Sequence, residues 1–153
     1  MTVHEKKAIE LFEGGYNCAQ AVFAAFSDVT GIDEATSKAL SSSFGGGMGR
    51  MREVCGAVSG MLMAAGILFG GDCNANANGG ADKSAHYARV RLLMERFKSE
   101  NGSYICRELL ELPAGASGGE PERRSREYYL RRPCSELVGC AARILDEYME
   151  TEK

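Results

Sequence analysis

Apolar residues recur along most of this chain at the spacing of one helical face, and glycine or proline interrupts each run. In one such run, positions i, i+3, i+4 and i+7 are Ala19, Val22, Phe23 and Phe26, which lie on one side of an α-helix. No segment alternates apolar and polar residues over the length of a strand, and valine and isoleucine are sparse. The pattern therefore predicts an all-α fold.

Capping residues and chain breakers set the expected helix ends. Asn17 and Asp33 are favourable N-caps, while Gly14-Gly15 and Pro113 end the helices that precede them. We expect a bundle of about six helices, drawn from residues 3–12, 17–31, 33–44, 52–69, 82–101, the shorter 104–112, and 134–150. Loops are expected at the glycine-rich residues 45–49, 70–81 and 114–122.

The length of 153 residues suits one domain, so we expect residues 1–153 to form a single helical domain. An uncharged run of 18 residues separates Glu53 from Asp72, but it contains five glycines. We interpret it as a buried central helix and expect no membrane span. Within it, Gly56 and Gly60 have the spacing of closely packed helix pairs, so a homodimer through this surface is a candidate.

The net charge of -3 and the pI near 5.5 argue against a protein that coats nucleic acid or an anionic membrane. Arginines gather around Tyr128 and Tyr129 between residues 123 and 132, and we interpret this stretch as a solvated face, not a nucleic-acid site. The N-terminal residues show no secretory signal, so the expected location is the reducing cytoplasm. We interpret His4 and His86 as surface or cap residues and expect no Cys–His catalytic pair.

Six cysteines stand at positions 18, 55, 73, 106, 134 and 140, and no two of them form a C-x-x-C pair. This spacing excludes a thioredoxin-type redox pair, a c-type haem site and the knuckles of a standard zinc finger. If the thiols act together, the fold must gather them from separate helices.

Three of the cysteines are expected at or near helix N-termini. Cys18 follows the N-cap Asn17, Cys55 lies just after the glycine-rich loop, and Cys134 follows a proline. Unpaired N–H groups and the positive end of the helix dipole favour a thiolate there, and can bring a cysteine pKa from about 8.5 into a range of roughly 3.5–7.5. Cys106 is expected inside a helix, on an apolar stripe that faces the core.

Glycines surround the proposed thiol region. We expect them to let backbone approach Cys55 closely, with Arg50 and Arg52 as counter-charges; the supporting glycines are Gly45, Gly46, Gly47, Gly49, Gly56 and Gly60. The loop lacks the Lys-Ser/Thr of a P-loop, so we do not interpret it as a phosphate site. Cys73 stands alone in a loop, and Cys140 lies about 9 Å of helical rise from Cys134, too far for a disulfide. We expect neither cysteine to belong to the thiol site.

Five strings in order carry a resemblance: YNCAQAV, FGGGMGR, CGAVSG, CRELL and CSELV. From about Gly14 to Tyr148 the chain resembles the small bacterial and archaeal proteins named for the pattern C_GCAxxG_C_C, which are described as redox-active. The resemblance implies that the family's four cysteines correspond to the chain's cysteines 18, 55, 106 and 134, and that Cys73 and Cys140 are additional. The GCA of the family's name reads Cys-Gly-Ala at Cys55.

Three functions stay open at this point. The favoured one is a thiol oxidoreductase that exchanges disulfides or transfers electrons with a redox partner or small-molecule substrate, with Cys18 and Cys55 attacking and Cys106 or Cys134 resolving. The second is a metal-binding module in which the same four thiolates hold an iron–sulfur cluster or zinc. The third is a helical interaction protein whose thiols only pack in the core.

Overall fold

The computed structural model describes residues 1–71 and 81–153, and over these residues it is all-α, as predicted. Six helices have eight residues or more: α1 (Val3–Glu13), α2 (Cys18–Ala25), α4 (Glu34–Ser41), α5 (Gly56–Phe69), α7 (Ala81–Asn101) and α10 (Cys134–Thr151). Among the described residues, three further helices are shorter: α3 (Ser27–Thr30), α8 (Cys106–Leu109) and α9 (Arg126–Arg131). A 3₁₀ turn, η1, spans Ser42–Phe44. Cys73 and most of the loop expected at 70–81 lie outside the described residues.

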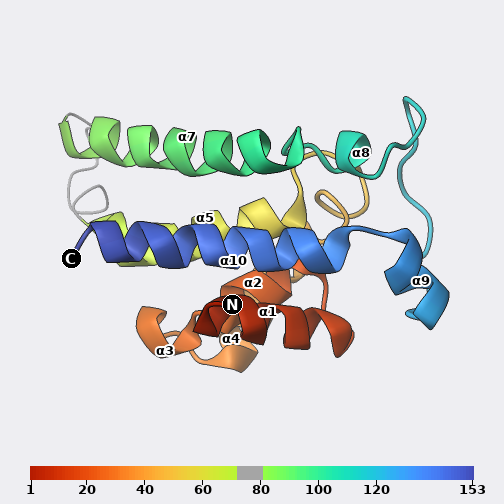
Figure 1. Cartoon of the computed structure of the whole chain (residues 1–153), viewed down its shortest axis with the longest axis horizontal. Coiled ribbons are helices and arrows are strands. Elements are labelled where there is room, and N and C mark those ends of the chain that lie inside the picture. Colours follow the sequence, from red (N-terminus) through yellow and green to blue (C-terminus); the bar gives the residue numbers. More distant parts are fainter. Residues whose placement is uncertain (72–80) are drawn as a thin grey trace.

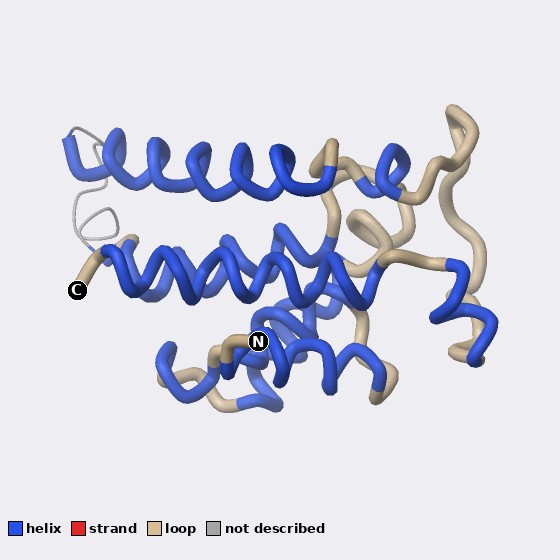
Figure 2. Tube along the Cα trace, viewed as in Figure 1, coloured by secondary structure: helices blue, strands red, loops and turns tan. Residues whose placement is uncertain are grey.

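Helix α10 runs through the middle of the fold, with α7 along one side and α1, α2 and α4 on the other (Figure 1). It packs against α1, α2, α5 and α7, and α5 packs in turn against α2. Most of the longer loops gather at the end of the bundle where α10 begins, together with α8 and α9 (Figure 2). Several helix starts and long loops therefore meet at one end of the molecule.

Small residues bring α2 and α5 into close contact. A Cβ atom on Gly60 would lie 2.6 Å from the Ala19 carbonyl oxygen, and one on Gly56 would lie 3.1 Å from Cys18 Cβ. Both glycines are buried inside the chain, so the surface expected to support a homodimer is already used within one copy. The interpretation of this run as a buried central helix is confirmed, and no described helix is long and apolar enough to cross a membrane.

His4 joins three helices and is not the surface residue expected. Its Nδ1 lies 2.5 Å from an Asp146 oxygen on α10, and its Nε2 lies 2.8 Å from an Asp28 oxygen on α3. The buried ring stacks on Phe26 with 4.2 Å between centroids. The hydrogen bond that the His4 ring donates to Asp146, with the one that it donates to Asp28, raises the pKa of His4 above its ordinary value despite burial.

Two predicted helices are shorter than expected because distant segments pair. Residues 52–55 precede α5 as extended or turn structure, and Val54 forms an antiparallel bridge with Ile105. That pairing also keeps 104–105 out of the helix expected at 104–112, so α8 begins only at Cys106.

The helix expected over 17–31 is divided at Phe26 into α2 and α3. At this break the Ser27 hydroxyl donates to the Ala24 carbonyl. Helix α9, capped by Ser125, was not expected from the sequence.

Candidate thiol site

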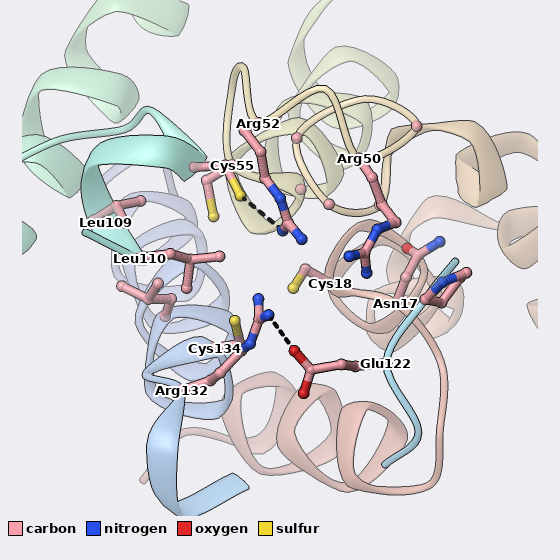
Figure 3. Close-up of a pocket in the computed structure, with 18 of the residues that line it drawn as sticks. Asn17, Cys18, Arg50, Arg52, Cys55, Leu109, Leu110, Glu122, Arg132 and Cys134 are labelled. Carbon is pink, nitrogen blue, oxygen red and sulfur yellow. Dashed lines mark hydrogen bonds and ion pairs between the residues drawn. The ribbon is translucent and has the colours of Figure 1, made fainter. Parts of the chain in front are cut away.

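Four cysteines from four helix starts line one cavity of about 350 Å³. Cys18, Cys106 and Cys134 are the first residues of α2, α8 and α10, and Cys55 is the N-cap of α5. We call this space the thiol cavity (Figure 3). The expectation that Cys106 lies inside a helix is wrong, because the 54–105 pairing delays the helix start. None of the described cysteines is in a disulfide.

Cys18 is positioned by the cap of its helix. The Asn17 side chain accepts from the Gln20 N–H at 2.9 Å, and the Gln20 side chain accepts from the Asn17 N–H at 3.0 Å, which forms a capping box. Asn17 also donates to the Ser42 carbonyl at 3.1 Å. A Cβ atom on Gly45 would lie 2.5 Å from this side chain, so the contact requires glycine there.

Cys55 and Cys106 are held by the paired segments that precede their helices. The Cys55 N–H donates to the Tyr104 carbonyl at 2.9 Å, and the Cys106 N–H donates to the Glu53 carbonyl at 2.6 Å. The glycine-rich loop approaches Cys106 closely, since a Cβ on Gly47 would lie 2.8 Å from Cys106 Cβ. The loop was expected to approach Cys55, but its close contacts are with Cys106 and with Asn17 beside Cys18.

The glycine-rich loop is a left-handed turn. Five successive residues, 46–50, have φ between 57° and 72°, and Met48 and Arg50 are not glycine. The left-handed conformation costs such residues roughly 1–2 kcal/mol each, so the surrounding contacts must hold it. The N–H groups of residues 48–53 all donate to carbonyls within residues 43–48. They are therefore engaged within the loop, in keeping with the absence of a P-loop motif.

Arginines face the thiols from both sides of the cavity. Figure 3 shows Arg50 and Arg52 reaching in from the glycine-rich loop, with Arg132 opposite them. Arg52 is only 6% exposed and donates to the Cys106 sulfur at 3.6 Å, whereas Arg132 donates to a Glu122 oxygen at 2.7 Å. The expected counter-charge is therefore seen for Arg52 at Cys106 and not at Cys55. Arg50 donates to the Gly118 carbonyl at 3.1 Å.

Two of the cavity arginines, Arg124 and Arg132, were not expected there, because their stretch was interpreted as a solvated face. Arg124 donates to the carbonyls of Phe12 and Tyr16 at 3.0 and 3.1 Å, and its guanidinium lies 4.2 Å from the centre of the Phe12 ring. Tyr128 is buried beside both arginines. The closeness of Arg132 to Cys134 in the sequence was the one available signal.

Cys134 is the thiol most disposed to ionise. A hydrogen bond from the Cys18 thiol, together with the positive charges of Arg132, Arg124 and Arg52, lowers the pKa of Cys134 to about 7 despite its burial. The same hydrogen bond, with burial, raises the pKa of Cys18 well above its ordinary value, because Cys18 holds the proton. The two thiols therefore form a donor–acceptor pair.

Burial outweighs the helix N-terminus at the remaining cavity thiols. It raises the pKa of Cys55 to about 12, and raises that of Cys106 against the opposing effect of Arg52. The expectation of a lowered pKa thus agrees with Cys134 and is wrong for Cys18 and Cys55. Desolvation disfavours the charged form. At Cys106 it outweighs the hydrogen bond and charge of Arg52, whereas at Cys134 the interaction with Cys18 and the charges of three arginines outweigh it.

Cys140 lies outside the thiol cavity. Its sulfur accepts from Asn101 at 3.3 Å, its thiol donates to Glu100 at 3.4 Å, and burial raises its pKa. Within the described parts of the chain, no three His, Cys, Asp or Glu side chains are arranged so that they could hold a metal ion. The four cavity thiols are near one another but not placed as the ligands of one ion.

The fold and cavity define a helical protein with four thiols gathered at the starts of four helices. A family model described as "Putative redox-active protein (C_GCAxxG_C_C)" matches residues 16–148, and the chain belongs to this family. The resemblance inferred from the five strings is thereby confirmed. The chain matches no curated protein and no solved structure.

Proposed function

We propose that this protein is a thiol oxidoreductase that exchanges disulfides through Cys134 and Cys18. The observation that carries the proposal is that Cys18 and Cys134 begin two helices and line one cavity, where interaction with Cys18, together with nearby guanidinium groups, lowers the pKa of Cys134 to about 7. A thiol with a pKa near ambient pH is the best attacking group in disulfide exchange. The family's description as redox-active supports the same chemistry.

In the first step the Cys134 thiolate attacks one sulfur of a substrate disulfide. A bond forms between Cys134 Sγ and that sulfur, the substrate S–S bond breaks, and the other half leaves as a thiolate that takes a proton from water. Cys134 then carries no negative charge, so its contribution, the largest of those that raise the pKa of Cys18, is removed, while that of burial remains.

In the second step Cys18 loses its proton to water and attacks Cys134 Sγ. The mixed disulfide breaks, the second half of the substrate leaves as a thiolate, and a Cys18–Cys134 disulfide forms. Two electrons pass from the protein thiols to the substrate, and the reverse sequence oxidises a pair of substrate thiols. In this scheme Cys134 attacks and Cys18 resolves, the reverse of the roles expected from the sequence.

Cys55 and Cys106 form the second pair of the site in this proposal. Both are buried and have raised pKa values, so they begin as thiols rather than thiolates. They can receive the Cys18–Cys134 disulfide by exchange and so return the first pair to the reduced state. We place this chemistry in the cytoplasm, where protein thiols are kept reduced.

Anaerobic oxidation with hydroxyethyl disulfide followed by peptide mapping tests the proposal. We expect a Cys18–Cys134 disulfide as the first product, loss of that product in Cys134→Ser, and its retention in Cys140→Ser, which removes a thiol outside the cavity. Metal analysis of the same preparation covers the iron–sulfur and zinc alternative. Stoichiometric metal bound by the cavity cysteines, or a first disulfide that excludes Cys134, would overturn the proposal.

A further inference from the structure

The thiol cavity has an excess of positive charge. Four guanidinium groups and one carboxylate, Glu122, line it among the described residues. Within that part of the chain, Arg50, Arg52 and Arg124 form no ion pair with a carboxylate. Burial, and then repulsion from Arg52 and Arg132, lowers the pKa of Arg50, as expected for positive charges that are not neutralised.

Arg52 is the clearest unneutralised charge. Its side chain is more than nine-tenths buried, lines the cavity, and donates to the weak acceptor Cys106 Sγ. Arg52 itself has a φ of 63°, so its backbone is strained at this position. A buried charge is unfavourable unless it is paired, and an anion entering the cavity would supply the missing partner.

A carboxylate of the chain itself, on the exposed residue Glu122, lies at the edge of this cavity. Glu122 reaches in from the loop before α9 and accepts from Arg132 at 2.7 Å (Figure 3). Its loop is held to the glycine-rich loop, where the Gly118 N–H donates to the Arg50 carbonyl at 2.8 Å and Arg50 Nε donates to the Gly118 carbonyl at 3.1 Å. Glu122 forms no ion pair with Arg50 or Arg52, so the charges of these two arginines are available to a second carboxylate.

The size and depth of the cavity favour a small molecule. About 350 Å³ falls within the range of pockets that hold small ligands, about 300–1,000 Å³. Cys134 is only 8% exposed, so a disulfide on the surface of a folded partner protein could not reach its sulfur without a large rearrangement.

We propose that the thiol cavity binds a small disulfide bearing carboxylate groups, which Arg52 anchors while Cys134 attacks its sulfur. This inference rests on the proposed exchange function and names its substrate class. The Cys134–S bond forms as the substrate S–S bond breaks, the leaving carboxylate-bearing thiolate takes a proton from water, and Cys18 completes the two-electron exchange as described above.

Two disulfides of similar length test the inference. Dithiodipropionate carries a carboxylate at each end, and hydroxyethyl disulfide is neutral. The measurement is the ratio of their second-order rate constants for oxidising the reduced protein, taken at one pH for every variant. The ratio cancels changes in the nucleophile. A free thiolate repels the anionic dithiodipropionate and should react with it no faster than with the neutral disulfide. If the cavity arginines attract the carboxylates, the protein should react with dithiodipropionate about tenfold faster or more.

Variants assign the preference to the cavity. Arg52→Met should lower the ratio about tenfold, and Arg52→Lys should restore part of it. Glu122→Gln removes the carboxylate that competes for Arg132 and should raise the ratio. Its side chain is exposed in a loop, so we expect this variant to fold. Arg91→Met removes the same charge from an exposed position on α7 and should leave the ratio unchanged.

The outcomes separate the two proposals. If hydroxyethyl disulfide forms the Cys18–Cys134 bond but dithiodipropionate reacts no faster, the exchange function stands and the anionic substrate is refuted. An unchanged ratio in Arg52→Met, or in Glu122→Gln where Arg52→Met does not fold, also refutes it. If neither reagent oxidises this pair, the exchange function itself fails.

Discussion

The pKa of Cys134 depends on a thiol from the opposite end of the chain, and removing that thiol should raise it. A value of about 7 lies two units below the ordinary 9.0, which corresponds to about 3 kcal/mol in favour of the thiolate. In Cys18→Ala the hydrogen bond is lost while the guanidinium groups remain. We therefore expect the pKa of Cys134 to rise by at least about one unit, which reduces its thiolate fraction near pH 7 about fivefold or more.

Alkylation of Cys134 by iodoacetamide, followed by mass spectrometry across a pH series, measures this change. The wild-type rate should reach half its maximum near pH 7 and that of Cys18→Ala at a higher pH, while the two rates converge above pH 9.0. Cys140→Ala, which removes a thiol outside the cavity, should leave the profile unchanged. An unchanged or lower midpoint in Cys18→Ala would refute the hydrogen-bond account.

Three further predictions concern the fold. Gly60→Ala should lower the free energy of unfolding by about 1–3 kcal/mol in urea titrations, because its Cβ would meet the Ala19 carbonyl, whereas Gly66→Ala has open space and should cost no stability; equal losses would contradict this. The raised pKa of His4 means that its stabilisation is complete below about pH 6.5 and is lost as pH rises through the folded value, so the deficit of His4→Gln should shrink with rising pH, and a constant deficit would argue against it. Asn17→Ala and Asp33→Ala should each cost about 1 kcal/mol in thermal or urea unfolding, but only the former should alter Cys134 alkylation, because only Asn17 lines the thiol cavity.

The ends of several helices could be predicted because the interactions that set them are local. Asn17 and Asp33 bond to N–H groups three residues ahead, and Gly31 takes the left-handed conformation that follows a helix. The start of α5 could not be predicted in this way. It depends on the pairing of Val54 with Ile105, and short segments of this kind leave no periodic signal.

The four site cysteines followed from the order of five strings, and their position at helix starts followed from neighbouring residues for Cys18, Cys55 and Cys134. Neither the order of the strings nor the neighbouring residues could show which thiol has the lowered pKa. A helix N-terminus acts in the same direction on each cysteine, yet Cys134 has a lowered pKa and Cys55 a raised one.

Capping, glycine conformation and helical periodicity involve residues within a turn or two, so the amino-acid order alone was enough to establish a helical protein with thiols at helix starts. Desolvation and Coulomb interactions depend instead on distances between segments far apart in the chain. Tertiary packing brings Cys18 and three arginines to Cys134 and leaves Cys55 buried without them. This packing therefore decides which of the four thiols has a lowered pKa.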